Sequence, residues 1–198
     1  RSIPLIAPGL NAQIRGFEGF EALAVIGERI YMTVESNSGS GMLTYLVSGN
    51  IASDLSAIRL ETNLLRPVPA QAAIANFSDE TIVAGEDRLL TLYEANGALY
   101  NPQPKAHPFD LNLNTLEPVA FPNIEYRITD STPIQPDGTF WAINYFFPGD
   151  SKIAPASDPL ASQFGEGATH IMYPQVERLV QFRVAGETIQ RVDRAPVQ

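Results

Sequence analysis

The sequence predicts an all-β fold, and two observations carry that prediction. Short runs rich in β-branched and aromatic residues are joined by tight glycine-containing turns, as in Phe20–Ile26, Gly27-Glu28 and Arg29–Val34, and such runs are typical of β-hairpins. The chain also has 16 prolines and 14 glycines at turn spacing, and stretches of ten or more residues with helical periodicity are hard to find. An α/β fold is therefore disfavoured.

The opening hairpin recurs twice further along the chain. The recurrences are Ala73–Tyr93 and Ile124–Tyr145, and each has a glycine-containing turn between two strand-like runs. Alternating apolar and polar residues predict further strands that complete each unit, because half-buried strands require that alternation. These further strands are expected at Met42–Val47, Ala57–Thr62, Pro108–Leu113, Leu179–Val184 and Thr188–Val192.

The spacing of the three hairpins predicts a β-propeller. When Glu21, Glu80 and Asp130 are set as equivalent, 59 and then 50 residues separate them, close to the period of roughly 40 to 50 residues of propeller blades with loop insertions. We predict about three four-stranded antiparallel blades in one propeller segment. The expected blades are approximately residues 14–70, 71–122 and 123–195, with a long loop insertion at 148–174.

Three blades do not close a ring, because propellers use about 4 to 8 blades. We expect a larger ring of about five or six blades, whose missing blades come from the same longer chain or from a second chain. The first source is favoured, since both ends of the sequence look arbitrary. The start at Arg1, not methionine, indicates a processed or cut end, and we expect a secreted or periplasmic location.

The composition of the chain limits the kinds of partner that we expect it to bind. The chain is 44% hydrophobic and 18% charged, which is typical of a globular domain, and no apolar run approaches the roughly 20 residues of a membrane span. A net charge of −9 excludes nucleic acid as an expected partner, because phosphate backbones need clustered Lys and Arg. The absence of cysteine removes disulfides and thiolate zinc sites. Acidity is compatible with binding divalent cations.

Three short motifs carry a resemblance to a known family. Gly16–Ala24 followed by Ile30–Ser36 resembles the opening hairpin of bacterial esterase-like phytase propellers, and Asn76–Glu80 with Leu90–Glu94 resembles a second hairpin of that family. Tyr126–Asp130 continues the match, which spans roughly residues 14 to 145. The resemblance implies a longer propeller that binds calcium and hydrolyses phosphoesters. The segment Trp141–Tyr145 has no counterpart among the motifs of that family that we can assign to catalysis.

Glu21, Glu80 and Asp130 are the candidate metal ligands. Each lies near the start of the first strand of its blade, and the innermost strands of a propeller converge on the central channel. Calcium prefers several oxygen ligands, which these carboxylates could provide together with amides such as Asn76 or Asn144. The alternative is that the acids only solvate the mouth of the channel.

Four further residues are candidates for substrate binding. Glu35 and Glu94 follow the second strand of the first two hairpins, so we expect them on the opposite rim from the strand starts or in adjoining loops, where they could bind a second cation. Arg127 could pair with a substrate phosphate, or form a structural ion pair with nearby Glu125 and Asp130. Asn144 is the fourth candidate.

The functional hypothesis is a calcium-dependent, phytase-like phosphoesterase that acts on an anionic small molecule. Calcium at Glu21, Glu80 and Asp130 would screen the substrate charge and activate water, while the catalytic residues stay unassigned. Ser38–Gly41 lacks the strand-turn-helix setting of a nucleophile elbow. The alternative is a non-catalytic secreted or cell-envelope propeller that binds a glycan or a protein.

Overall fold

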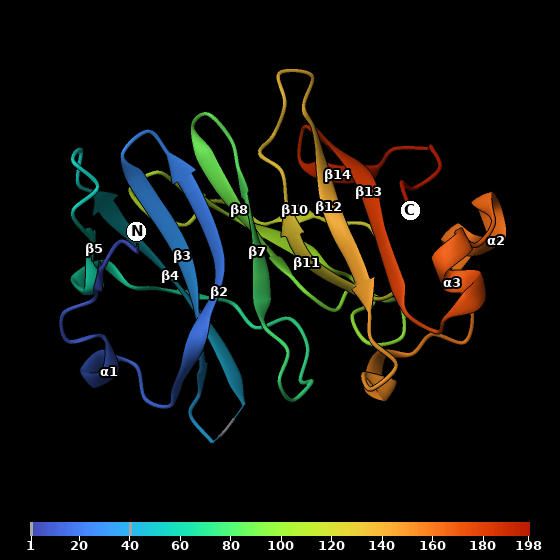
Figure 1. Cartoon of the computed structure of the whole chain (residues 1–198), viewed down its shortest axis with the longest axis horizontal. Coiled ribbons are helices and arrows are strands. Elements are labelled where there is room, and N and C mark those ends of the chain that lie inside the picture. Colours follow the sequence, from blue (N-terminus) through green and yellow to red (C-terminus); the bar gives the residue numbers. More distant parts are fainter. Residues whose placement is uncertain (1, 40) are drawn as a thin grey trace.

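The computed structural model describes residues 2–39 and 41–198 and is built mainly of β-strands, with a few short helices (Figure 1). The all-β prediction is confirmed. The strands form two curled sheets, one of six strands and one of eight. No helix among the described residues has the length and apolar character to cross a bilayer.

The first sheet is built around a four-stranded antiparallel meander. Its strands are β2 (Phe17–Ile26), β3 (Arg29–Asn37), β4 (Met42–Ile51) and β5 (Ile58–Leu60). Ile26 pairs with Arg29 across a two-residue turn in which Gly27 has φ 62°, a left-handed conformation that glycine adopts without strain. Short β1 (Leu5–Ile6) pairs with β5, and β6 (Arg66–Val68) pairs with β4.

The second sheet contains two more meanders of four strands. The second meander consists of β7 (Asp79–Ala84), β8 (Arg88–Tyr93), β9 (Lys105–Asp110) and β10 (Val119–Ala120). The third consists of β11 (Arg127–Ser131), β12 (Thr139–Phe146), β13 (Val176–Ala185) and β14 (Thr188–Arg191). A parallel pairing of Ala120 with Thr188 joins their outer strands into one eight-stranded sheet.

The three meanders lie side by side, with β7 in contact with both β2 and β11 (Figure 1). Apolar side chains fill the space between the first and second meanders, including Tyr31, Leu46, Leu89 and Phe109. A second core lies between the second and third meanders. Each meander thus buries a face by stacking on its neighbour, since one sheet face must be covered to be stable.

The insertion at 148–174 is not the predicted loop. It contains a 3-10 helix, η2 (Ser151–Ile153), and two short helices, α2 (Pro159–Phe164) and α3 (Ala168–Met172). Asp158 caps α2 by accepting a hydrogen bond from the Leu160 N–H, and Pro159 occupies the first turn, where its missing N–H costs nothing. Two other short helices are α1 (Leu10–Gln13) and η1 (Thr62–Leu64).

Candidate acidic site

The site centres on Arg127, the first residue of β11, whose guanidinium contacts three carboxylates. Its Nη2 lies 2.7 Å from Glu80, its Nε 2.7 Å from Glu94, and its Nη1 3.3 Å from Asp150. The guanidinium also lies over the ring of Phe77, 5.5 Å from its centroid. Each guanidinium nitrogen therefore lies within ion-pair distance of an acid, and the pairs of Nη1 and Nη2 also have hydrogen-bond geometry, whereas the pair of Nε with Glu94 does not.

Strand irregularities place the acids at this point. The register of β7 against β8 shifts between Asp79 and Thr81, so Glu80 is the extra residue of a bulge. The register of β2 against β3 shifts around Glu18 and again between Phe20 and Leu23, where Glu21 lies. Bulges redirect side chains and are common beside functional sites. Three acidic residues of β2 and β7, Glu18, Glu21 and Glu80, thus occupy irregular positions.

Glu35 and Glu94 lie beside these strand starts, and the expectation that they lie on the opposite rim is wrong. Glu35 pairs with Gly19 near the start of β2, and the Glu94 N–H donates to the Ser78 carbonyl just before β7. In an antiparallel hairpin the end of the second strand returns to the start of the first. Both side chains are buried, and the Glu94 carboxylate also accepts a 2.7 Å hydrogen bond from the Ser78 N–H.

Burial and mutual repulsion make these carboxyl groups reluctant to ionise. Burial raises the pKa of Glu35, and Glu21, Glu18 and Glu80 raise it further by charge repulsion. Burial also raises the pKa of Glu80 against the opposing effect of Arg127, and Glu21 adds repulsion. The pKa of Glu94 is raised by burial and by Glu80. Burial is the largest cause in each case, so these carboxyl groups keep their protons to higher pH than free carboxyl groups do, and they outnumber the one guanidinium beside them.

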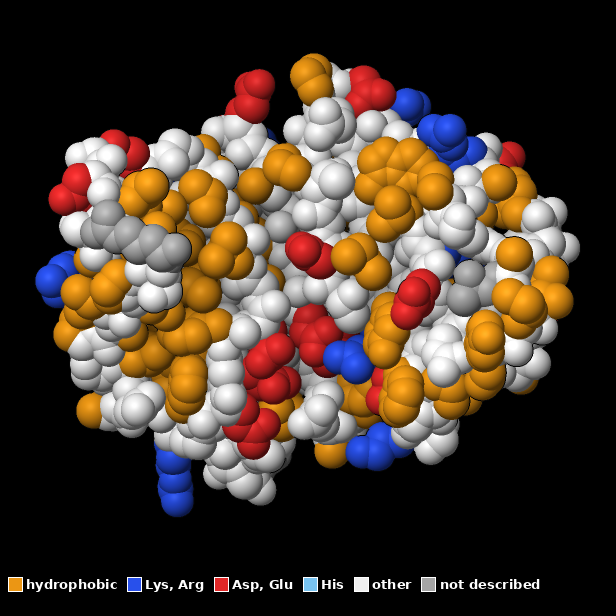
Figure 2. Space-filling view, in the orientation of Figure 1, with side chains coloured by type: hydrophobic (Ala, Val, Ile, Leu, Met, Phe, Trp, Pro, Cys, Tyr) orange, Lys and Arg blue, Asp and Glu red, His pale blue; other side chains and the backbone are white. Residues whose placement is uncertain are grey.

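The carboxyl groups around Arg127 form a group that we call the acidic cluster. Figure 2 shows carboxylate side chains gathered beside a basic side chain near the centre of one face of the molecule. Within the described part of the chain, these acids outnumber the one basic side chain that pairs with them, so ionisation of the group would favour a cation over a free anion. The cluster consists of Glu18, Glu21, Glu35, Glu80, Glu94 and Asp150 around Arg127.

Two of the three predicted metal ligands lie in the acidic cluster, and the third lies elsewhere. Glu21 and Glu80 belong to the acidic cluster, whereas Asp130 is exposed, accepts a 2.7 Å hydrogen bond from the Ser131 N–H and lines a groove with Trp141 and Leu179. Across the described residues, no three His, Cys, Asp or Glu side chains are arranged as a ready metal-ligand group. A calcium site at these residues stays a prediction.

Asn144 is buried and fully engaged within the third meander. Its side-chain amide donates to the carbonyls of Glu125 and Arg127, at 2.9 and 3.1 Å, and its oxygen accepts from Arg178 at 2.8 Å. This arrangement fixes the backbone on both sides of Tyr126, which has a positive φ of 68°. Asn144 thus positions Arg127 through the backbone of β11.

Sequence reasoning missed one acid of the site, Asp150, and a further buried acid, Asp79, lies next to the site. Asp150 follows Phe147-Pro148-Gly149 in the insertion and reaches Arg127 from there; no local pattern indicated that contact. Asp79 is fully buried next to Glu80, with its N–H donating to the Thr44 hydroxyl, and burial raises its pKa to about 7.

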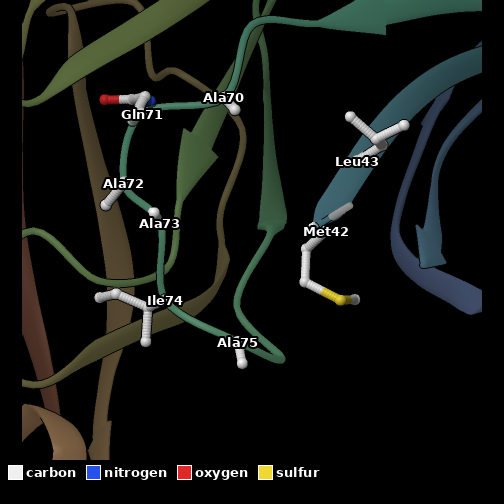
Figure 3. A pocket seen from close by; sticks show the side chains of 9 residues that line it. Met42, Leu43, Ala70, Gln71, Ala72, Ala73, Ile74 and Ala75 are labelled. Atoms are coloured by element: carbon white, nitrogen blue, oxygen red, sulfur yellow. The ribbon is translucent and has the colours of Figure 1, made fainter. Parts of the chain in front are cut away.

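A separate groove of about 540 Å³ lies between the start of β4 and the extended segment 70–75 (Figure 3). Met42 and Leu43 line one side, and Ala72, Ala73 and Ile74 line the other. None of the described residues that line it has a titratable side chain. This groove can hold apolar groups.

Comparisons with known proteins identify no family. No protein-family model matches the sequence, and no curated protein matches it. Among solved structures, the chain is similar to a mutant of the Synechocystis apocarotenoid oxygenase at 9% sequence identity, with a TM-score of 0.45. The alignment covers 82% of this chain and 34% of the oxygenase, so the chain spans about a third of that protein's length.

Proposed function

We propose that the chain forms three blades of a β-propeller that binds calcium at the acidic cluster and hydrolyses a phosphoester. The observation that carries this proposal is the surplus of carboxylates at the acidic cluster, with raised pKa values at Glu35, Glu80 and Glu94. A bound divalent cation would offset that charge, and the close packing of acids is otherwise unfavourable.

The propeller assignment is supported by topology. Each meander runs through four antiparallel strands in chain order, and the first strands β2, β7 and β11 are neighbours. Successive blades of a propeller have this arrangement, with the first strand of each blade nearest the axis. The acidic cluster draws on the starts of these first strands, where a propeller would have its central channel.

The cation assignment is supported by the kind of ligand. Glu21, Glu35 and Glu80 would hold calcium, because it binds carboxylate oxygens and tolerates irregular geometry. Glu18 and Glu21 are exposed, so their side chains can turn toward an ion. When bound, calcium would supply a positive charge for a phosphate oxygen and lower the pKa of a water molecule.

The cation also resolves how an anionic substrate would bind. Arg127 was predicted to bind phosphate, but its nitrogens are engaged by Glu80, Glu94 and Asp150. A phosphate approaching Arg127 alone would meet three carboxylates. We therefore assign to Arg127 the role of holding Glu80 and Glu94 in place, and to the cation the attraction of substrate.

The test is phosphate release from p-nitrophenyl phosphate and inositol hexakisphosphate, with calcium and with a chelator. We expect calcium-dependent release that falls at least tenfold in Glu80→Gln and is unchanged in Glu86→Gln, because Glu86 is exposed in the β7–β8 turn. Release that is equal in chelator would contradict the proposal. A protein that binds calcium but releases no phosphate would instead be a binding module.

That binding module is the second candidate, and the groove of Figure 3 favours it. Its lining of small and apolar residues is typical of sites that bind an apolar segment of a ligand or partner.

A further inference from the structure

Tyr93, the last residue of β8, contacts the wall of the apolar groove of Figure 3 and lies near the acidic cluster. Its hydroxyl donates a 3.4 Å hydrogen bond to the carbonyl of Ala72, which lines the groove. Burial raises the pKa of Tyr93. Repulsion from Glu94, Asp79 and Glu35 raises this pKa further, and charges act most strongly over short distances. One buried side chain therefore lies between the groove and the acids.

Both walls of the groove continue along the chain into the acidic cluster. Leu43, on one wall, directly precedes the cross-strand partner of Glu35. Ala75, on the other wall, lies two residues before Phe77. The ring of Phe77 packs beneath the guanidinium of Arg127, 5.5 Å from it. The groove and the acidic cluster are therefore adjacent, and one ligand can contact both.

The groove exists because two neighbouring segments separate. The pairing of β6 with β4 extends to Val68, and Pro69 follows, which has no N–H for a further ladder hydrogen bond. The chain then runs through residues 70–75 on the opposite side of the groove from the start of β4 (Figure 3). The Gln71 side chain holds this segment, because it donates to the Lys105 carbonyl and accepts from the Lys105 N–H, each at 2.8 Å. The groove is therefore formed before a ligand binds, as most ligand sites are.

The lining of the groove suits an apolar group. Apart from Gln71, the described lining side chains are those of alanine, methionine, leucine and isoleucine. The volume of about 540 Å³ falls within the range of about 300 to 1,000 Å³ of small-molecule sites. The adjacent cluster offers carboxylates that suit a divalent cation. The two regions together match a ligand that has an apolar part and an anionic part, the second held through the cation.

We propose that the groove binds the alkyl group of a phosphomonoester whose phosphate reaches calcium at the acidic cluster. This inference rests on the proposed function and names its substrate class, the phosphate monoesters of apolar alcohols. In the reaction, a water oxygen forms a bond to phosphorus, and the bond between phosphorus and the alcohol oxygen breaks. One proton of the water ends on the alcohol and the other on the phosphate. The products are an apolar alcohol and inorganic phosphate.

The selectivity of such a site should follow the length of the alkyl chain. Each methylene group that leaves water for the groove should raise kcat/KM by about fourfold at most. A fully polar ester such as inositol hexakisphosphate has no apolar group to place in the groove. Chain length is therefore the variable that separates a role of the groove from hydrolysis at the acidic cluster alone.

The experiment measures phosphate release from methyl phosphate and from octyl phosphate, with calcium and below the micelle concentration of the octyl ester. We expect kcat/KM to be at least tenfold higher for octyl phosphate. Ala73→Trp should reduce this ratio to about one, because Ala73 is an exposed residue of the groove lining and the indole would fill the groove. Ala12→Trp is the matched control, since Ala12 is exposed on α1; it should retain the ratio. Circular dichroism establishes that both variants are folded.

The outcomes separate this inference from the proposed function. Calcium-dependent release with equal kcat/KM for the two esters overturns the inference alone and leaves the groove to an apolar segment of a partner. A preference for octyl phosphate that Ala73→Trp retains also overturns it. If neither ester is hydrolysed, the proposed function fails, and calorimetry with octyl phosphate and calcium decides the inference. Binding that Ala73→Trp weakens at least tenfold supports the groove as the site of the alkyl group, and no binding overturns it.

Discussion

Arg127 Nε lies 2.7 Å from a Glu94 oxygen, and this ion pair is buried between the second and third meanders. The Glu94 side chain is fully inaccessible and that of Arg127 is 20% exposed. The backbone reinforces the pair, because the Ile128 N–H donates to the Glu94 carbonyl. The guanidinium therefore joins two meanders at the point where the acids gather, and it should influence both stability and cation binding.

Replacement of Arg127 by methionine should destabilise the fold strongly at high pH. The variant leaves Glu80, Glu94 and Asp150 without their cation, and breaking a buried pair costs about 3 to 5 kcal/mol. The unpaired carboxyl groups would have folded-state pKa values above their unfolded ones, so the deficit should grow as pH rises from 5 to 8. Urea unfolding at both pH values measures it.

Arg88→Met is the matched control for that experiment. Arg88 pairs with Asp87 at 2.9 Å, but both side chains are largely exposed, and such pairs contribute less than about 1 kcal/mol. The account of Arg127 would be contradicted by an R127M deficit that equals the R88M deficit, or by one that shrinks with rising pH.

Asp79→Asn should change how stability depends on pH. Burial raises the pKa of Asp79 from 3.8 to about 7, so the folded state holds a proton that the unfolded state has released between these values. The contribution of Asp79 to the free energy of unfolding is fully present below pH 3.8 and is lost as the pH rises to about 7. The asparagine variant has no such loss, and its advantage over wild type should increase across that window, to at most about 4 kcal/mol.

Thermal or urea unfolding at pH 4, 5.5 and 7.5 measures the difference in stability between wild type and D79N. Glu86→Gln is the control, because Glu86 is exposed in the turn between β7 and β8. A difference between wild type and D79N that stays constant with pH would show that Asp79 is ionised throughout.

Asp158→Ala should destabilise the insertion that carries α2. Asp158 caps α2 and also pairs with Arg178, whose Nη1 lies 2.6 Å from its carboxylate and whose side chain is almost completely buried. The variant loses a cap and leaves a buried guanidinium without its acid, at a cost of about 3 to 5 kcal/mol. Hydrogen exchange should show faster opening of α2, whereas Asp193→Ala, at an exposed hydrogen bond to Gln163, should not.

The strands could be predicted from the sequence because their signals are local. The hairpin at Gly27 has the alternation and the turn residues that decide its register, and the structure has it as expected. The helices of the insertion could also have been found, since Asp158-Pro159 is a start signal for a helix. That signal was outweighed by the general proline, serine and glycine content of 148–174.

The site was only partly predictable, for two physical reasons. Glu35 was expected on the rim opposite the start of β2. Because β3 runs antiparallel to β2, the end of β3 lies beside the start of β2, and Glu35 lies there. The expected ion-pair partners of Arg127 were its sequence neighbours, Glu125 and Asp130. Its ion pairs come from Glu80, Glu94 and Asp150. Those contacts depend on how the meanders stack on one another, and no short stretch of the sequence indicates that stacking.

The central claim, calcium at the acidic cluster, is tested most directly by titration calorimetry at pH 7 in two buffers of different ionisation enthalpy. Because Glu35, Glu80 and Glu94 have raised pKa values, calcium should displace protons as it binds, and the measured heat should differ between the buffers. Glu80→Gln should weaken binding at least tenfold, and Glu86→Gln should not. Absence of calcium binding at millimolar concentration, or binding with the same heat in both buffers and the same affinity in Glu80→Gln, would contradict the account.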